Sequence, residues 1–313
     1  MVDFDFDDPE EGDFHIVKAL VQRCLDGATL DSSALADILI DQVQSCLLCT
    51  PPAGIRVRPM GSERHCQHAV QAEVSTVMRT GDNCVGIAAV LPLALFQKRP
   101  PLQQIAAHWL KHADKGCKER LQKSLSGGRA ALLLTERVHN APSSVAAAVL
   151  AILVRDLAAA AGCGDAEVQA HAAFDEVLVC AKGYADEGSG VAGTGAVSVS
   201  AGTAAVVRPL VGRGRPEVDA EASPRCNGSH SSARVQGVAS STAAPGTVFL
   251  RAEEEVLHSH ASWSCSWAAP QEGQFKQHVA PLRVLFCVPK KKLRKAVQAL
   301  AKMFDHDLTV HGL

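Results

Sequence analysis

The chain has 313 residues, of which 47% are hydrophobic and 20% are charged. These values are typical of a globular protein with one sizeable core. No stretch reaches the roughly 18 uninterrupted apolar residues that a membrane-spanning helix needs, because Pro92 interrupts one candidate and Arg155 and Asp156 interrupt the other. The acidic N-terminus is unlike a secretory signal, and eleven irregularly spaced cysteines are typical of reduced thiols. We therefore expect a soluble intracellular protein.

Charge is distributed unevenly along the chain. There are 33 acidic and 31 basic residues in total, but seven acids and no bases lie within the first thirteen residues. The rest of the chain therefore has 26 acids and 31 bases. A concentrated negative surface attracts cationic partners and repels nucleic acids. We expect a partner to bind at the acidic front, which consists of Asp3, Asp5, Asp7, Asp8, Glu10 and Glu11.

The N-terminal segment is predicted to form a short strand followed by two helices. Phe4 and Phe6 alternate with aspartates, as in a strand buried on one side. Asp13 is placed to cap a helix that ends before Gly27 and has an apolar stripe of Phe14, Val17, Val21, Cys24 and Leu25. A second helix begins near Asp31–Ser33, and its apolar face contains Leu35, Ile38, Leu39, Gln42 and Val43.

Two long segments are predicted to be insertions. Residues 50–80 contain no aromatic residue and many turn formers, which predicts a loop. Residues 186–246 comprise 61 residues, of which 33 are Ala, Gly, Ser or Thr. Such a segment buries too little apolar surface to offset its loss of conformational entropy, so we expect it to be disordered. The folded domain would then comprise residues 1–185 and 247–313.

The remaining segments alternate between strands and helices. Continuous apolar runs predict strands, and apolar residues at helical spacing predict helices. The predicted strands are Val85–Leu91, Ala130–Leu134, Phe174–Lys182, Ser262–Ala268 and Leu282–Val288. The predicted helices contain Leu102–Trp109, the segment from a cap at Ser143 or Ser144 to Gly162, Glu253–Ala261 and Lys290–Phe304. This order indicates an α/β fold, with one domain built on a mixed central sheet flanked by helices.

Two further patterns suggest binding sites, each with an alternative interpretation. Cys46, Cys49, His65 and His68 could provide thiolate and imidazole ligands for zinc. Alternatively, Cys46 packs at the end of a helix and the histidines lie in an exposed loop. The basic run of Lys290, Lys291, Lys292, Arg294 and Lys295 is either a nuclear import signal or the solvated first turn of a helix.

No pattern in the chain indicates catalysis or a resident cofactor. Gly188, Gly190 and Gly193 match a dinucleotide-binding motif, but low-complexity sequence follows them where that motif requires a helix. We expect Glu253–Glu255 to be a solvated helix start. Glu136 and Arg137 either border an active site or mark a surface turn after a strand, and we favour the turn. We therefore expect no enzymatic activity, no cofactor, no membrane contact and no specific nucleic-acid recognition.

Several blocks of this chain resemble the BCCIP family in the same order and spacing. They cover most of the chain outside residues 50–80 and 186–246, although alanine or cysteine stands at positions where the family tends to have Tyr or Phe. The blocks are Val2–Phe6 with Pro9, Asp13–His15, Leu30–Asp37, Val85–Leu110, Leu132–Arg137 with Asn140 and Pro142, Ala252–Leu257 with His260 and Ala261, and Leu282–Val288 followed by the basic helix.

The resemblance implies a function that composition does not reveal. Family members are nuclear proteins of ribosome biogenesis that escort a basic large-subunit ribosomal protein, and the fungal member is tied to nuclear export. Animal members also act as adaptors in cell-cycle control and recombinational DNA repair. The family fold is similar to that of GCN5-related acetyltransferases without their acetyl-CoA site. A divergent acetyltransferase therefore remains an alternative to a nuclear escort protein or adaptor.

Overall fold

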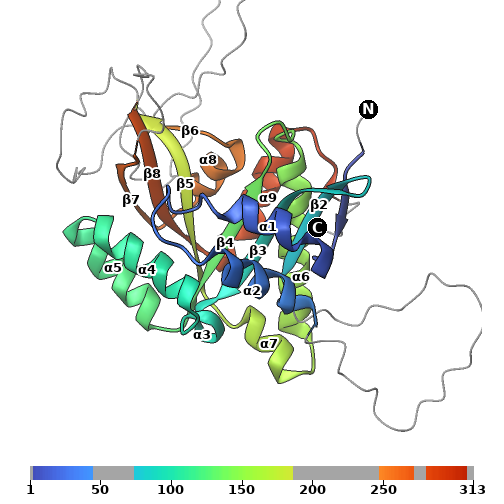
Figure 1. The fold of residues 1–313 in the computed structure, drawn as a ribbon, viewed down its shortest axis with the longest axis horizontal. Coiled ribbons are helices and arrows are strands. Elements are labelled where there is room, and N and C mark those ends of the chain that lie inside the picture. The colour runs from blue at the N-terminus through green and yellow to red at the C-terminus, as the bar shows by residue number, and fades with distance from the viewer. Residues whose placement is uncertain (1–2, 45–73, 186–246, 271–279, 309–313) are drawn as a thin grey trace, which may run out of the picture. The chain divides into compact units, whose positions relative to one another are not determined.

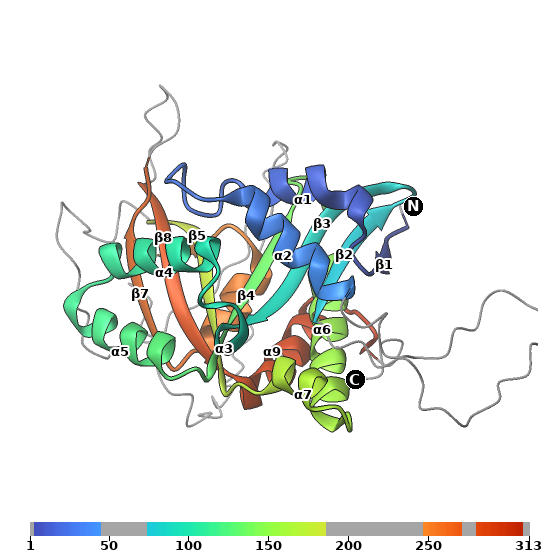
Figure 2. The same ribbon diagram turned by 60° about the horizontal axis from the view of Figure 1, so that its bottom comes forward.

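The computed structural model describes residues 3–44, 74–185, 247–270 and 280–308. These residues form an eight-stranded sheet with helices on both faces (Figures 1 and 2). The strands are β1 (Asp5–Asp7), β2 (Ser75–Thr80), β3 (Asn83–Pro92), β4 (Ala130–Arg137), β5 (Glu176–Ala185), β6 (Thr247–Phe249), β7 (Trp263–Ala268) and β8 (Ala280–Pro289).

The sheet is mixed, with the strand order β1-β2-β3-β4-β5-β8-β7 and with β6 paired to β5 beside this path. The β4–β5 pair is parallel, and the other pairs described are antiparallel. The predicted α/β class with a central mixed sheet is therefore confirmed. The expected similarity to acetyltransferases stays a prediction.

The helices divide between the two faces of the sheet according to their order in the chain. The core on one face contains residues from the first five helices, and the core on the other face contains residues from the last four. The first group is α1 (Phe14–Val21), α2 (Ser32–Gln44), α3 (Leu93–Phe96), α4 (Pro100–His112) and α5 (Lys115–Ser126). The second group is α6 (Val145–Gly162), α7 (Ala166–Ala172), α8 (Ala252–Ser259) and α9 (Lys290–Met303).

Helix α6 is the longest of the described helices, and it is strongly apolar. Among the described residues, it is the one helix with the length and hydropathy of a membrane span, and 61% of it is buried within the protein. Its buried residues include Val145, Val149 and Leu153, which recur at helical spacing. Ser144 stands at the N-cap, but its side chain makes no capping hydrogen bond. The extent of burial is typical of a core helix.

Three predictions for local structure need correction. Residues 75–80, which we included in a loop, form β2, and the segment Lys115–Ser126 forms the unpredicted helix α5. Strand β2 contains four buried residues in succession and pairs with both β1 and β3. Pairing with these two strands stabilises the extended conformation of this segment, and its own sequence pattern does not reveal that pairing. Asp13 precedes α1 but does not cap it. Its carboxylate instead accepts a hydrogen bond from the backbone N–H of Glu10 (2.9 Å).

The two ends of the predicted disordered insertion are adjacent in the sheet. The chain leaves β5 at Ala185 and returns in β6 at Thr247, and these two residues are paired in register. The predicted insertion itself, residues 186–246, lies outside the described residues. Strand β5 also pairs along its whole length with β8. Segments on both sides of residues 186–246 therefore contribute to the same sheet.

Gly86 of β3 lies where neighbouring strands leave no room for a side chain. A Cβ atom at this position would lie 2.9 Å from Cβ of Arg137 and 3.1 Å from the carbonyl oxygen of Glu136. We expect Gly86→Ala to lower the free energy of unfolding by about 1–3 kcal/mol, as measured by urea denaturation. Gly162→Ala is the control because its Cβ would meet nothing within 4 Å. An equal effect of both substitutions would contradict the proposed crowding.

Candidate functional site

A gap in the sheet brings charged residues from distant segments together. Strands β4 and β5 pair only from Ala130 to Leu132 of β4, although both strands continue further. The segment before α8 spans the gap. The N–H of Leu250 donates to the carbonyl of Lys182 on β5 (2.9 Å), and Arg251 Nη1 donates to the carbonyl of Thr135 on β4 (2.5 Å). This segment therefore holds both diverging strands.

Two arginine–glutamate pairs with little exposed side-chain surface connect β4 to α8 and the residue before it. Arg251 Nη2 donates to Glu136 Oε2 (2.6 Å). Arg137 donates to both carboxylate oxygens of Glu253, and the exposed fractions of these two side chains are 9% and 1%. Because charges are costly to remove from water, buried ion pairs of this kind depend on close geometry. We call these residues, together with Glu254, the gap cluster.

Burial affects the protonation of Glu254, a member of the gap cluster. Burial raises the pKa of its carboxyl group from 4.5 to about 8, although the positive charge of Arg251 lowers it. The neighbouring carboxylates Glu253 and Glu136 raise this pKa further. Burial thus favours the neutral form of Glu254 over its carboxylate.

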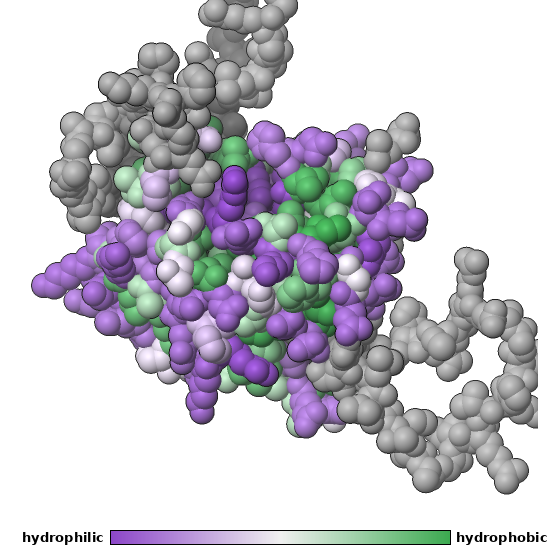
Figure 3. All heavy atoms as spheres, viewed as in Figure 1, coloured by the Kyte–Doolittle hydropathy of each residue, from purple (hydrophilic) through white to green (hydrophobic). Residues whose placement is uncertain are grey.

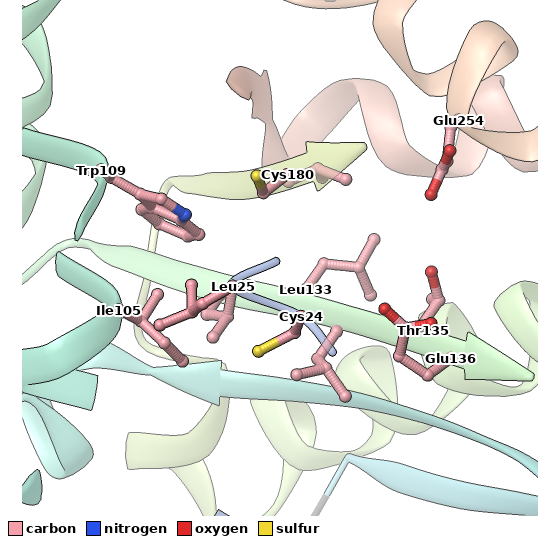
Figure 4. Close-up of a pocket in the computed structure, with 12 residues that line it drawn as sticks. Cys24, Leu25, Ile105, Trp109, Leu133, Thr135, Glu136, Cys180 and Glu254 are labelled. Carbon is pink, nitrogen blue, oxygen red and sulfur yellow. The ribbon is translucent and has the colours of Figure 1, made fainter. Parts of the chain in front are cut away.

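A small cavity lies beside the gap cluster, and Figure 4 shows its lining. Its volume of about 30 Å³ suits one or two water-sized groups. Cys24 and Cys180 line it, and burial raises the pKa of each thiol to about 12. Both are therefore protonated near neutral pH, whereas a nucleophilic cysteine needs its thiolate form.

The gap cluster corrects two predictions made from the sequence. Glu253 and Glu254 are 1% and 4% exposed, whereas we expected a solvated helix start; in that run, only Glu255 is exposed. Glu136 and Arg137 end strand β4, as the predicted strand-to-loop transition requires, but their side chains are only 14% and 9% exposed and pair within the cluster, whereas we expected them on the surface. Their partners lie more than a hundred residues away, so local sequence contains no signal for these contacts.

The acidic front has the predicted strand geometry. Asp3, Asp5 and Asp7 are exposed, while Phe4 and Phe6 pack against the core. The segment Asp5–Asp7 forms β1 and pairs with β2 in register. Of the other predicted partner-binding residues, Glu10 and Glu11 are exposed and Asp8 is half-buried. The aspartates of β1 are thus held on a strand.

Arg79 of β2 fixes this strand to the segment that follows it. Its guanidinium lies 2.7 Å from the carboxylate of Asp13 and 3.5 Å from that of Asp7. Asp13 is buried, while the Asp7 side chain is 54% exposed. Arg79 therefore pairs most closely with Asp13, and its contact with the more exposed Asp7 is longer.

Hydrophobic residues on the face shown in Figure 3 form small areas between larger hydrophilic ones. One of these areas lies over α1, whose Ile16 is 38% exposed. Scattered apolar residues of this kind are normal on a protein surface and do not by themselves indicate a binding site. On this face, charged residues are therefore a better guide to a binding site than exposed apolar residues are.

The predicted basic run forms the first turns of α9, and the fold binds two of its five cations. Lys290 Nζ donates to the carbonyl of Ala172 (2.5 Å) and lies 4.6 Å from the centre of the Phe174 ring. Lys292 Nζ donates to the carbonyl of His260 (3.1 Å). The exposed cations are Lys291, Arg294 and Lys295. The run is therefore partly a structural helix start, and its use as an import signal stays a prediction.

The predicted zinc ligands Cys46, Cys49, His65 and His68 lie outside the described residues. Within the described part of the chain, no group of three or more histidine, cysteine, aspartate or glutamate side chains is arranged to hold a metal ion. The zinc interpretation therefore stays a prediction for the segment 45–73.

Comparison with protein families decides the chain's relationship. The model of the BCCIP family matches residues 1–257, which is well over half of the chain. The chain belongs to the BCCIP family. The match includes the acidic front and all residues of the gap cluster. Membership in BCCIP implies a protein that binds protein partners.

Structural comparison agrees with this assignment at the level of the fold. The chain is similar to the crystal structure of BCP1 from Saccharomyces cerevisiae, with a TM-score of 0.51 and 13% sequence identity. The similarity covers 96% of this chain and 88% of BCP1. A search of curated protein sequences finds no match. At this identity, the BCP1 structure supports a shared fold and nothing about the partner.

Loss of one member of a buried pair in the gap cluster should destabilise the fold. Arg137→Met would leave the carboxylate of Glu253 buried and unpaired, so we expect the free energy of unfolding to fall by about 3–5 kcal/mol. Chemical denaturation followed by circular dichroism measures this change. A double variant that adds Glu253→Gln should recover part of the loss, because it removes the unpaired charge.

The control is Arg129→Met, which breaks the ion pair between Arg129 and Asp175. These side chains are 73% and 58% exposed, so water can solvate the remaining carboxylate. We expect little change in stability. Similar losses for Arg137→Met and Arg129→Met would show that burial of the gap cluster does not determine its contribution.

Proposed function

We propose that this BCCIP-family chain is a non-enzymatic nuclear protein that escorts a basic large-subunit ribosomal protein during ribosome biogenesis and nuclear export. The family resemblance supports the ribosomal client and the nuclear location. The exposed aspartates of β1 support recognition of a basic surface. Capture of the client by complementary charge would speed their encounter and shield the client's cations from RNA.

The observation that carries this proposal is the fixed geometry of the acidic front. In a strand, side chains at alternate positions project to the same side, so Asp3, Asp5 and Asp7 form a row. Pairing with β2 and the contacts of Phe4 and Phe6 restrain that row. A restrained row loses less conformational entropy on binding than a flexible tail would.

Nuclear import of the chain could use the exposed cations of α9. Lys291, Arg294 and Lys295 are on the surface, whereas Lys290 and Lys292 bind backbone carbonyls. An import receptor would therefore meet a helical basic surface. Such a helical surface differs from a linear basic signal, because recognition of a linear signal would require the first turn of α9 to unfold.

Affinity purification from the source cell, followed by mass spectrometry, would identify the partner. Enrichment of a basic large-subunit ribosomal protein would support the escort function. Enrichment of cell-cycle or recombination proteins without ribosomal proteins would instead favour the adaptor function.

Substitution of the aspartate row should weaken client capture. We expect the triple variant Asp3→Asn, Asp5→Asn and Asp7→Asn to bind its ribosomal client about tenfold more weakly, because it would lose several exposed ion pairs that each contribute modestly. A pull-down with the purified client in rising salt measures this effect. Binding by the unsubstituted chain should also fall with salt.

A control variant changes the net charge equally at other sites. It combines Glu119→Gln, Glu167→Gln and Glu255→Gln, which replace exposed acids on α5, α7 and α8. Client capture should stay close to that of the unsubstituted chain. Equal losses in both triple variants would show that net charge, rather than the row, governs binding.

The cavity beside the gap cluster leads us to expect no binding of acetyl-CoA. The diverging strands β4 and β5 enclose about 30 Å³ there, and the Arg251–Glu136 pair lies at the same gap. A nucleotide-sized ligand would have to displace this buried pair. Titration calorimetry should therefore give only heats of dilution. A saturable heat with acetyl-CoA would instead favour the divergent acetyltransferase.

A further inference from the structure

Helices α4 and α5 form a basic hairpin on one side of the sheet. The two helices lie side by side, and α5 lies beside the edge strand β7 (Figures 1 and 2). Residues 98–129, which contain both helices, have eight basic residues and two acidic ones. All eight basic side chains are exposed: Lys98, Arg99, Lys111, Lys115, Lys118, Arg120, Lys123 and Arg129.

The positive charge is concentrated towards the end of α4 and along α5. At the start of α4, Asp37 and Asp41 of α2 line a hollow together with Arg99, so acids offset the charge there. The acids at the other end of the hairpin are Asp114 and Glu119. Asp114 is the N-cap of α5. We call the basic residues of this end, Lys111, Lys115, Lys118, Arg120 and Lys123, the hairpin cations.

Neighbouring elements do not neutralise the hairpin cations. Asp175 approaches the end of the hairpin and pairs with Arg129. Asp26 approaches α4 and accepts a hydrogen bond from Arg283 Nε (2.7 Å). Within the described part of the chain, none of the hairpin cations has an ion-pair partner. An anion is therefore the complementary ligand of this surface.

A hollow of about 480 Å³ with aromatic walls lies beside the hairpin cations. Its lining includes His108, Lys111 and His112 of α4 and Trp267 near the end of β7. The Trp267 ring stacks on that of His112, with centres 5.8 Å apart and planes at 20°, and the centre of the His108 ring lies 6.4 Å away. This volume falls within the range of about 300–1,000 Å³ for small-molecule pockets.

The fold brings this aromatic surface to the cations, although Trp267 is distant from α4 in the sequence. Trp267, α4 and α5 all pack against the core on the same face of the sheet. Trp267 is half-buried, and Lys111 is exposed and lines the same hollow. A flat aromatic ring and a row of cations therefore adjoin on one surface.

Single-stranded nucleic acid has the two chemical groups that this surface suits. Its phosphates bind lysine and arginine, and its bases stack on aromatic side chains. An acidic peptide would match the charge but would bring no base to the aromatic hollow. Stacking tolerates every base, so such binding needs no sequence preference. It is therefore compatible with the absence of motifs for specific nucleic-acid recognition.

We propose that the basic hairpin binds single-stranded nucleic acid without sequence preference. Phosphates contact Lys111, Lys115 and Lys118, and one base enters the hollow beside Trp267. This inference goes beyond the escort function. Strands β1 and β7 lie at opposite ends of the strand order, so the acidic front and the hairpin belong to opposite edges of the sheet. The chain can then hold a basic protein and a nucleic acid at the same time.

Tryptophan fluorescence tests whether a base enters the hollow. Of the three tryptophans, Trp109 and Trp263 are 3% and 8% exposed, whereas Trp267 is half-buried and lines the hollow. A short oligouridine added to the full chain should quench part of the fluorescence, because its bases stack on Trp267. A polyglutamate peptide of equal charge should leave the fluorescence unchanged, because it has no ring.

Two double variants test the hairpin cations, with the anisotropy of labelled oligouridine as the measure of affinity. Lys115→Gln with Lys118→Gln should weaken binding about tenfold. It should also reduce the salt dependence, the slope of log K against log salt concentration, by about 1.4, because each phosphate contact contributes about 0.7. The control, Lys18→Gln with Lys302→Gln, removes two cations from α1 and α9 and should bind like the unsubstituted chain.

Two substitutions of Trp267 separate stacking from charge. Trp267→Leu keeps an apolar side chain but removes the ring, so oligouridine binding should weaken about tenfold with an unchanged salt dependence. Trp267→Phe keeps an aromatic ring and should retain most of the affinity. Circular dichroism checks that both variants fold.

The outcomes separate this inference from the escort function. Equal losses in the two double variants would overturn the hairpin as the binding surface. Unquenched fluorescence, or equal affinity for polyglutamate and oligouridine, would overturn nucleic acid as its ligand. If the chain still captured its ribosomal client in these cases, the escort function would stand alone. Hairpin-dependent binding of oligouridine without capture of any ribosomal protein would support this inference and count against the client.

Discussion

The paired charges of Arg251 with Glu136 and of Arg137 with Glu253 connect strand β4 to α8 across the gap where β4 and β5 part. A parallel pair that stops after three residues leaves backbone groups on both strands without ladder partners. Arg251 and Leu250 donate hydrogen bonds to two of these groups, the carbonyl oxygens of Thr135 and Lys182. The gap cluster therefore replaces missing sheet hydrogen bonds with side-chain contacts. It also joins two of the sequence blocks that resemble the BCCIP family, Leu132–Arg137 and Ala252–Leu257.

Like the gap cluster, the acidic front depends on contacts with residues that are distant in the sequence. Its strand is only three residues long, so β1 would not persist without β2 and the apolar contacts of its phenylalanines. Arg79 offsets the buried charge of Asp13 while the outer carboxylates stay exposed. Asp13 is thus buried and paired while other acids of the same segment stay in solvent, which explains why that segment can be strongly charged and still fold.

Sequence patterns predicted the elements whose apolar residues recur locally, such as α6 and β8, and the alternation of Phe4 and Phe6 predicted the exposed aspartate row. They failed for β2 and α5. Strand β2 follows a segment rich in turn formers, and α5 buries only Cys117, Leu121 and Ser124. The gap cluster was also missed, because the burial of Glu253 becomes favourable only through an arginine far away in the chain.

The pairing of Ala185 with Thr247 has a consequence for how this chain can vary. Because the ladder itself brings the two ends together, the 61 residues between them span almost no distance. The entropy of closing such a loop grows only with the logarithm of its length, by about 0.6 kcal/mol for each doubling. Residues can therefore be gained or lost between β5 and β6 with little effect on the domain, so this position can acquire new sequence faster than the core around it.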